Sequence, residues 1–387
     1  MRVVMLVLND MTADARVDRE AAALAAVGHD VTVLALRAAN ASDYERRSGY
    51  TIQRVADYTT ATWRHPWRKL HQLQHRKEAL IRKALALEPE VVHAHDTDTL
   101  AVAALIADVV HVPLVYDAHE LYPDMIAEFG VGGAWPVQTF WKRTERRHVP
   151  KATAVITVSD GLSAELGRRF GVAPVVVRNV PPPEPVMRSS RLRDDLGVGS
   201  DVSLVLYQGV LIGGRGLARL ASAMREVPGA VLAIQGSGPE ESAIQDAARE
   251  AGIGDRVRLM GRMPSDELHE YACGADIGVV IYEHTTLNNY LAGPNKLYSY
   301  LMAGLPIAAS DFPGIREVVA GGEVGALFDP ANEASISTAL RGLLGDLEAR
   351  AAMGTRARYL AETKYNWDLE KRKLLDVYDQ LAARSTS

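Results

Sequence analysis

Gly293 and Pro294 stand shortly before a basic residue, Lys296, in a segment with the spacing of a short helix. Gly304 follows the segment and would end the helix. With Pro294 at the first helical position, we expect the next backbone N–H groups, beginning with that of Asn295, to have no partner inside the helix. Such a helix start attracts anions, and a lysine in the first turn opposes the helix dipole unless an anion is bound. The segment therefore predicts either a phosphate site or a solvated lysine on a core helix.

A glycine-rich run earlier in the chain is a second candidate for anion binding. Gly213, Gly214 and Gly216 surround Arg215 at the end of a strand-like run. Glycines let the backbone approach a ligand closely, and a guanidinium can donate two hydrogen bonds to phosphate oxygens. Glycine-rich turns are also common without a ligand. Because Arg215 and the helix start at Lys296 both follow strands of one predicted domain, together they suit a diphosphate.

The turn at Arg262 and Met263 is a third candidate in the same predicted domain. It follows the strand-like run R-V-R-L-M and precedes a helix that we expect Ser265 to cap. A main-chain loop in this place can hydrogen-bond a nucleobase, and an ordinary turn fits these residues equally well.

In the first half of the chain, polar residues gather where three apolar, strand-like runs end. They are Asp14 and Arg16 after the first run, His95 and Asp96 after the second, and His119 and Glu120 after the third. Polar side chains at the end of the first run are hard to explain by packing, so we expect Asp14 and Arg16 to face a ligand cleft, and His119 is well placed to face it as well.

His93 and His95 alternate along one of these runs, so their side chains point to the same face of a strand. Together with Asp96 and Asp98 they superficially offer metal ligands, and the two aspartates imitate the Asp-x-Asp pattern of metal-dependent sugar-nucleotide enzymes. However, Asp98 opens a predicted helix, where a carboxylate caps N–H groups or interacts with the helix dipole. We therefore expect no functional metal site.

Short runs of Val, Ile and Leu alternate with longer stretches of helical period along the chain. This alternation is typical of a parallel α/β sheet. It stops at the prolines between residues 181 and 185, where neither a helix nor a central strand can continue, and then begins again. We expect two Rossmann-like domains, over residues 1–182 and 183–366, that face a central cleft. A last helix, over residues 367–387, would pack back on the first domain.

Composition limits the class of protein. The 387 residues include 48% hydrophobic side chains and carry a net charge of -5, which suits a globular protein with two cores and provides no nucleic-acid arm. Cys273 is the only cysteine, so neither an internal disulfide nor a cysteine-based zinc site is possible. No apolar run has the length of a membrane span or the form of a secretion signal, so we expect a cytoplasmic protein.

The segment from Trp63 to Lys83 is locally rich in basic residues, with Trp67 as a second tryptophan and Glu78 as its acid. A basic amphipathic helix with tryptophan side chains can lie on an anionic membrane or bind an anionic acceptor. Most such runs are simply the solvated face of a helix. The segment leaves all three possibilities open, including a peripheral membrane contact.

Several motifs resemble those of one known family, in order and over essentially the whole chain. They are V-Y-D-A-H-E-L-Y-P, I-T-V-S-D-G-L, V-R-N-V-P-P, Q-G-V-L-I-G-G-R-G-L and P-N-K-L-Y-S-Y-L-M-A-G-L-P-I. Each is loose, but jointly they resemble the retaining glycosyltransferases of family four, which have the GT-B fold. The resemblance implies a nucleoside-diphosphate sugar of UDP or GDP type in the second domain. It implies a glycan, lipid-linked or small-molecule acceptor in the first, and neither a metal nor a cofactor.

The same resemblance implies roles for individual residues. Arg215 and Lys296 would contact the donor diphosphate, and His119 would face the transferred sugar near its anomeric carbon. The remaining donor-binding residues would be Gly213, Gly214, Arg262, Met263, Asn288, Asn289, Asn295 and Ser299. The acceptor-binding residues would be Asp14, Arg16, His95, Asp96 and Glu120.

The chain departs from the family pattern at three positions. Val210 stands where the family often has an arginine, and Leu291 and Ser299 stand where it has a pair of glutamates separated by seven residues. The second glutamate normally holds the ribose hydroxyls. A hydrogen bond to a charged group contributes about 1.5 to 3 kcal/mol, so its loss could weaken donor binding by about 10- to 100-fold. We therefore expect an altered donor subsite.

Two other functions fit the same features. A sugar-nucleotide epimerase can share this two-domain plan but needs carboxylates to move protons, for which Glu120 and Glu283 are the nearby acids. A catalytically silent GT-B subunit that binds a partner transferase would explain the missing glutamates.

Overall fold

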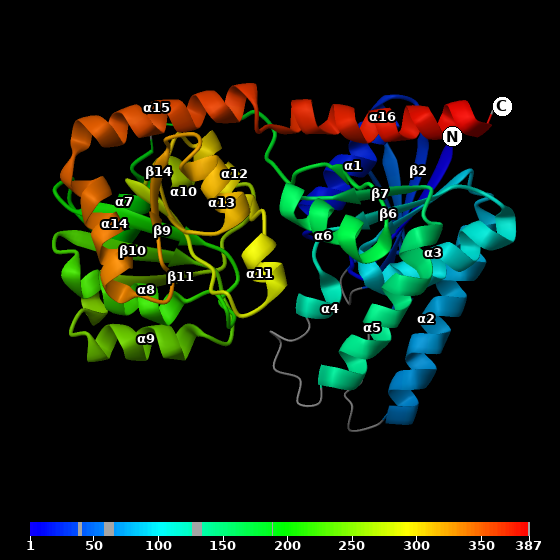
Figure 1. Cartoon of the computed structure of the whole chain (residues 1–387), viewed down its shortest axis with the longest axis horizontal. Coiled ribbons are helices and arrows are strands. Elements are labelled where there is room, and N and C mark those ends of the chain that lie inside the picture. Colours follow the sequence, from blue (N-terminus) through cyan, green and yellow to red (C-terminus); the bar gives the residue numbers. More distant parts are fainter. Residues whose placement is uncertain (38–40, 58–65, 126–133, 188, 386–387) are drawn as a thin grey trace. The chain divides into compact units, whose positions relative to one another are not determined.

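The structure, a computed structural model, describes residues 1–37, 41–57, 66–125, 134–187 and 189–385. The chain divides into two compact units, which Figure 1 draws with their helices and strands labelled. Unit 1 comprises Met1–Val177 and Lys371–Ser387, and unit 2 comprises Arg178–Glu370.

These units divide at residues that differ from our expectation. We expected the first boundary inside the proline run, and we expected the whole last helix to belong with the first domain. Instead, the backbone N–H of Trp367 donates to the carbonyl of Pro181 (2.9 Å), and that of Arg178 donates to the carboxylate of Glu370 (2.9 Å). These bonds hold the proline run and the first turn of the last helix in unit 2.

Unit 1 contains an eight-stranded sheet with the order β3-β4-β2-β1-β5-β6-β7-β8. All neighbouring strands are parallel except the antiparallel pair β3 and β4. Strands β5 and β6 are buried along their whole length, as expected for parallel strands covered on both faces. The strands are β1 (Arg2–Leu6), β2 (Asp30–Arg37), β3 (Tyr44–Arg47), β4 (Tyr50–Asp57), β5 (Val91–His95), β6 (Leu114–Ala118), β7 (Ala154–Thr157) and β8 (Val175–Val176).

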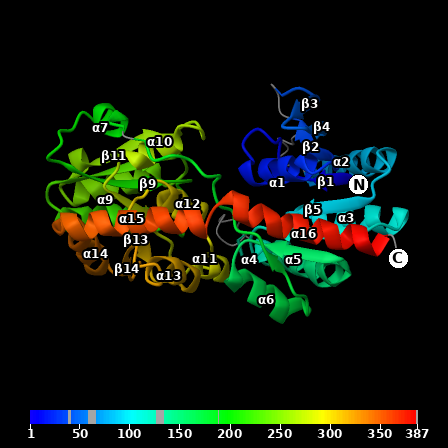
Figure 2. The same ribbon diagram turned by 90° about the horizontal axis from the view of Figure 1, so that it is seen from above.

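The helices of unit 1 connect these strands, and the last helix of the chain returns to the same unit. Figures 1 and 2 both show α16, in red, lying along unit 1. Leu374, Tyr378 and Leu381 on this helix are buried. The helices are α1 (Ala15–Ala26), α2 (Pro66–Ala86), α3 (Asp96–Val110), α4 (Tyr122–Met125), α5 (Ala134–His148), the 3-10 turn η2 (Val149–Lys151), α6 (Asp160–Phe170) and α16 (Trp367–Ser385).

Unit 2 contains a six-stranded sheet with the order β11-β10-β9-β12-β13-β14. Every neighbouring pair is parallel, with Leu232 of β10 opposite Val205 of β9, for example. The strands are β9 (Ser203–Gln208), β10 (Ala230–Gln235), β11 (Val257–Gly261), β12 (Ile277–Val280), β13 (Ile307–Ser310) and β14 (Gly325–Phe328).

Helices cover both faces of this second sheet. Figure 1 shows α8 and α9 below the strands and α12 and α15 above them. Leu220 and Ile244, from α8 and α9, join the core formed with Val205 and Leu232 of the sheet. The helices are α7 (Arg191–Leu196), α8 (Leu217–Ala223), η3 (Met224–Glu226), α9 (Glu241–Glu250), η4 (Gly254–Arg256), α10 (Leu268–Cys273), α11 (Leu287–Leu291), α12 (Asn295–Met302), α13 (Pro313–Val319), α14 (Glu333–Gly345) and α15 (Leu347–Thr363).

The parallel α/β architecture predicted for each half of the chain is therefore confirmed. In both sheets the strand order reverses at one point, between β1 and β5 in unit 1 and between β9 and β12 in unit 2. Ligands of open parallel sheets bind outside the carboxyl ends of the strands at such a switch point. The loops that follow β1, β5, β9 and β12 are thus the places to look for a site.

Candidate functional site

Two cations lie at the switch point of unit 2 and share one aromatic ring. The Nζ atom of Lys296 is 3.7 Å from the ring centre of Tyr207 and 5.6 Å from that of Tyr282. The guanidinium carbon of Arg215 is 4.2 Å from the ring centre of Tyr282. Burial, together with the nearby charge of Arg215, lowers the pKa of Lys296 well below its usual value. A bound anion would raise this pKa again, because its negative charge would stabilise the protonated lysine and offset the charge of Arg215.

Gly209 makes room for this lysine. It follows β9 with a φ of 148°, and a Cβ atom built on it would lie 2.8 Å from Lys296 Nζ. Any larger residue would push the ammonium group away from its place over Tyr207. The next residue, Val210, is 59% exposed, so the position at which the family often has an arginine is open to solvent.

The helix that carries Lys296 begins one residue later than we predicted. Pro294 is the N-cap of α12, with φ -70° and ψ 133°, and Asn295 is the first helical residue. The N–H of Leu297 donates to the carbonyl of Pro294 (3.0 Å). The N–H groups of Asn295 and Lys296, at the first two helical positions, are the ones without an intrahelical acceptor. Gly304, with φ 67°, follows the helix as expected.

Asn289, which we expected to bind the donor, has a different environment. The residue is fully buried, and its Oδ1 accepts a hydrogen bond from Nη1 of Arg215 (2.7 Å). Its Nδ2 donates to Thr285 Oγ1 (3.1 Å) and to the carbonyl of Gly214 (3.4 Å). The amide is therefore used within the protein and holds Arg215. Its neighbour Asn288 is buried as well.

The remaining donor candidates lie on loops and helix starts of unit 2. Ser299, on α12, donates from its hydroxyl to the carbonyl of Asn295 (3.3 Å). Arg262 is exposed and Met263 half-buried in the loop after β11, and the helix that follows begins at Leu268 with Glu267 as its N-cap, so Ser265 does not cap it. Gly214 adopts a φ of 76°, and the space beside Gly213 is open.

Glu283, nominated for proton transfer, pairs with Arg219 and is therefore neutralised by a neighbour.

In unit 1, two carboxylates hold His119 at the end of β6. Its Nε2 lies 3.0 Å from Oδ2 of Asp117, and its Nδ1 lies 3.2 Å from Oδ2 of Asp96. Burial opposes protonation, but the charges of Asp96 and Asp117 prevail and raise the pKa of His119 to about 10. The ring is therefore a cation at neutral pH, and 19% of the side chain is exposed.

Arg16 does not face a cleft, in contrast to our prediction. The residue is 4% exposed, and its Nε and Nη2 each donate to the carboxylate of Asp117 at 2.8 Å. Its Nη1 donates to the carbonyl of Val177 (2.8 Å). The guanidinium is therefore held inside unit 1 by Asp117 and the carbonyl of Val177.

Asp14 and His95 are also used inside unit 1. Asp14 is the N-cap of α1, where it accepts from the N–H of Val17 (3.1 Å) and from Nδ2 of Asn9 (2.7 Å). His95 is 3% exposed. Of the predicted acceptor residues, Asp14, Asp96 and Glu120 are half-buried and keep part of their surface exposed.

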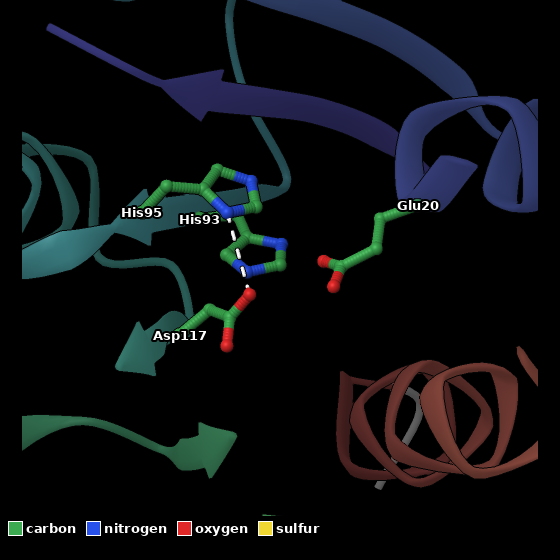
Figure 3. Close-up of side chains that lie close together, drawn as sticks. All are labelled: Glu20, His93, His95 and Asp117. Atoms are coloured by element: carbon green, nitrogen blue, oxygen red, sulfur yellow. Dashed lines mark ion pairs between the residues drawn. The ribbon is translucent and has the colours of Figure 1, made fainter. Parts of the chain in front are cut away.

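Four buried side chains in unit 1 could offer ligand atoms to a metal, and these atoms lie within 4.8 Å of one another. The residues are Glu20, His93, His95 and Asp117. Figure 3 shows their side chains pointing toward one another from α1, β5 and β6. Sequence reasoning missed Glu20, although its position four residues after Arg16 on a helix was a usable signal. Burial raises the pKa of Glu20 to about 7.

The four residues could hold a metal only after rearrangement. The rings of His93 and His95 stack with centres 4.2 Å apart and planes at 22°. A metal ion would need the carboxylates of Glu20 and Asp117 as ligands. Nε of Arg16 also lies 3.0 Å from Glu20 and 2.8 Å from Asp117, so a cation already serves both carboxylates. The arrangement is that of a buried ion-pair network beneath His119.

The basic segment from Trp63 to Lys83 lies partly outside the described residues, which include no side chain between residues 56 and 73. No helix in the described part of the chain is both long and apolar enough to cross a membrane. Peripheral membrane contact through this segment stays a prediction.

Two doubly wound α/β units, with a pair of cations at the switch point of the second, are typical of folds that bind nucleotides. Comparisons with known proteins identify the family within this class of fold. The family model described as Glycosyltransferase Family 4 matches residues 14–183, and that described as Glycosyl transferases group 1 matches residues 189–359. The chain belongs to the GT-B glycosyltransferases of the family-four type.

Individual relatives agree with this assignment. A GDP-mannose-dependent alpha-(1-6)-phosphatidylinositol monomannoside mannosyltransferase of Mycolicibacterium smegmatis is 27% identical over 61% of this chain and 64% of its own length. The match therefore spans less than two-thirds of the length of this relative. A glycogen synthase of Mycobacterium tuberculosis is 26% identical over 94% of this chain and 89% of its own. The solved sucrose-phosphate synthase of Thermosynechococcus elongatus has a TM-score of 0.81 at 19% identity, covering 99% of this chain and all of that one.

Proposed function

We propose that this protein transfers a sugar from a nucleoside-diphosphate sugar to an acceptor hydroxyl with retention of the anomeric configuration. The observation that supports it best is the cation pair of unit 2. Lys296 and Arg215 approach the same ring, and in the part of the chain that the structure describes neither forms an ion pair with a carboxylate. Two half-buried cations that lie side by side without a counter-ion repel each other unless a ligand supplies the negative charge.

The proposed chemistry is the departure of a nucleoside diphosphate from the anomeric carbon. Lys296, Arg215 and the first N–H groups of α12 would stabilise the negative charge as it develops on the leaving phosphate. Donors fixed in place before the reaction are usually the largest catalytic contribution. Neither a protein nucleophile nor a metal or other cofactor is part of this proposal.

His119 and the acceptor belong to unit 1 in the same proposal. A cationic ring fixed between two carboxylates would steer the transferred sugar rather than attack it. Asp96 and Glu120 are the partly exposed polar groups beside it. Arg16 and His95 are withdrawn as acceptor ligands because they are buried, and Asp14 because its carboxylate caps α1 and accepts from Asn9. A glycan, a lipid-linked glycan or a small metabolite are the acceptor classes.

The donor base and sugar are proposed only as a class. The mannosyltransferase relative is named for GDP-mannose, and the loop at Arg262 and Met263 would bind the base of either a UDP or a GDP sugar. Ser299 would meet the ribose. Its neutral hydroxyl is a weaker partner than a carboxylate, so we propose a donor affinity at the weak end of the range for the family.

The test combines nucleotide binding with transfer. Titration calorimetry with UDP, GDP and their sugars is performed on the unchanged protein and on Lys296→Ala and Arg215→Ala. Each variant should weaken nucleotide binding by about 10-fold or more and reduce transfer, because a charge-assisted hydrogen bond contributes about 1.5 to 3 kcal/mol. Arg249→Ala, an exposed arginine on α9, should change neither quantity.

Unchanged transfer in both variants would rule out the proposed diphosphate site. Incubation of the unchanged protein with donor alone, followed by NMR, separates the other functions. A new epimer would support the epimerase. No nucleotide binding, together with co-purification of an active transferase, would support the silent subunit.

A further inference from the structure

Asp96 adopts an unusual backbone conformation at the junction of β5 and α3. Its φ of 61° lies in the left-handed region, which few residues other than glycine occupy, although aspartate and asparagine tolerate it best. An aspartate at a helix start usually caps the helix. At the start of α3 the N-cap residue is His95, and its side chain makes no capping hydrogen bond. Asp96 is the first helical residue, and the backbone hydrogen bond that its carboxylate accepts comes from His119.

The carboxylate of Asp96 is directed at His119. Its Oδ2 lies 3.2 Å from Nδ1 of the ring, and its Oδ1 accepts from the backbone N–H of His119 (3.2 Å). One carboxylate thus holds both the side chain and the main chain of the residue. Asp117 holds the opposite ring nitrogen at 3.0 Å.

The two carboxylates differ in what else they bind. Asp117 is completely buried and also accepts from Arg16 and lies beside His95. It therefore supports the unit as well as His119. Asp96 has a side chain that is 29% exposed, and among the described residues His119 is the partner of its carboxylate. Its removal should disturb His119 without dismantling the core.

We propose that Asp96 is a positioning residue that fixes the ring and the main chain of His119 for the transfer reaction, in place of the acceptor-binding role expected for it. This inference rests on the proposed function, in which His119 faces the transferred sugar. The charged and titratable groups facing His119 are Asp96, Asp117, His95 and Arg16. Among these, Asp96 is the one that holds the backbone of His119 as well.

The first measurement does not depend on activity. The ring of His119 is titrated by NMR in the unchanged protein, in Asp96→Asn and in the control Asp108→Asn, an exposed position on the same helix. Asparagine suits the left-handed backbone, so the variant should fold. Loss of an adjacent opposite charge should lower the pKa of His119 by about one unit or more, while the control leaves it unchanged.

The second measurement is kinetic. Because misplacing a reacting group acts on the transition state, Asp96→Asn should reduce kcat by about 10-fold or more, with the KM for the acceptor within about twofold. Asp96→Gly relieves the backbone strain while removing both contacts. It should be at least as stable to heat as the unchanged protein and as slow as Asp96→Asn.

An unchanged titration of His119 in Asp96→Asn would overturn the proposal, and so would a raised acceptor KM with an unchanged kcat. Full activity in Asp96→Gly would do the same, since it would assign only a backbone role to this position. If the unchanged protein transfers no sugar, the proposed function fails, and the NMR titration still decides whether Asp96 holds His119.

Discussion

At the scale of single residues, some polar side chains are available to a ligand, whereas others are used to hold neighbouring protein groups in place. Asn289 belongs to the second kind, since its amide bonds Arg215, Thr285 and Gly214. Arg16 belongs there too, because Asp117 and Val177 take its donors. The cations themselves, Arg215 and Lys296, remain turned toward aromatic rings rather than acids.

Substitution of Asn289 tests how much this support contributes. Asn289→Ala should let Arg215 move and weaken binding of UDP or GDP by about 10-fold, as expected for loss of a hydrogen bond to a charged group. Asn289→Asp should weaken it more, because a buried carboxylate would pair with the guanidinium and compete with the phosphate. Calorimetry on both variants measures the order. Tighter binding in Asn289→Asp than in Asn289→Ala would contradict it.

Sequence reasoning found the residues that carry charge and missed those that support them. Glycines around Arg215 and the proline before Lys296 are local signals, readable within a few positions. The bonds from Arg16 to Asp117 and from Arg215 to Asn289 join residues 101 and 74 positions apart, and no local pattern encodes them. The resemblance to a family assigned Asn289 to donor binding, and its burial and hydrogen bonds in the structure revealed the other role.

At the scale of elements, strands and helices were predictable because their patterns are periodic, whereas their ends were less so. Pro294 occupies the N-cap position of α12 instead of the first helical position, and Glu267 rather than Ser265 occupies the N-cap position of α10. Neither side chain makes a capping hydrogen bond. In both cases the residue that we expected at the start of the helix lies one or two positions from its expected place relative to that start. Tertiary packing, which fixes where the first turn can form, decides between neighbours of similar propensity.

The contact between α16 and β5 provides a test at this scale. The hydroxyl of Tyr378 lies 2.9 Å from Nδ1 of His93, which is completely buried and whose Nε2 has no hydrogen-bond partner among the described residues. Tyr378→Phe would leave the other ring nitrogen unpartnered too. We expect a loss of about 1 to 3 kcal/mol in the free energy of unfolding of unit 1.

Urea denaturation followed by circular dichroism measures that loss. Tyr359→Phe, on α15, is the matched control because its side chain is 64% exposed. Equal urea midpoints for the two variants would mean that the hydroxyl of Tyr378 does not stabilise the packing of α16 against β5.

At the scale of the whole molecule, the two units differ in how the chain builds them. Unit 2 is one continuous stretch, Arg178–Glu370, whereas unit 1 needs Lys371–Ser387 in addition to Met1–Val177. The returning stretch contributes four buried apolar side chains: Leu374, Val377, Tyr378 and Leu381. At about 1.5 to 3 kcal/mol for each buried side chain, they contribute roughly 6 to 12 kcal/mol, which is comparable to the total stability of a domain.

This difference predicts that the two units, produced as separate fragments, will fold differently. A fragment of residues 178–370 should unfold in one cooperative transition and bind UDP or GDP nearly as well as the whole chain, because it contains Lys296, Arg215 and Asn289. A fragment of residues 1–177 should stay unfolded until a peptide of residues 371–387 is added, since the returning helix completes its core. Calorimetry and circular dichroism on the separate fragments measure both. If the first fragment folds but does not bind a nucleotide that the whole chain binds, residues of unit 1 must take part in donor binding, and the diphosphate site assigned to unit 2 is incomplete.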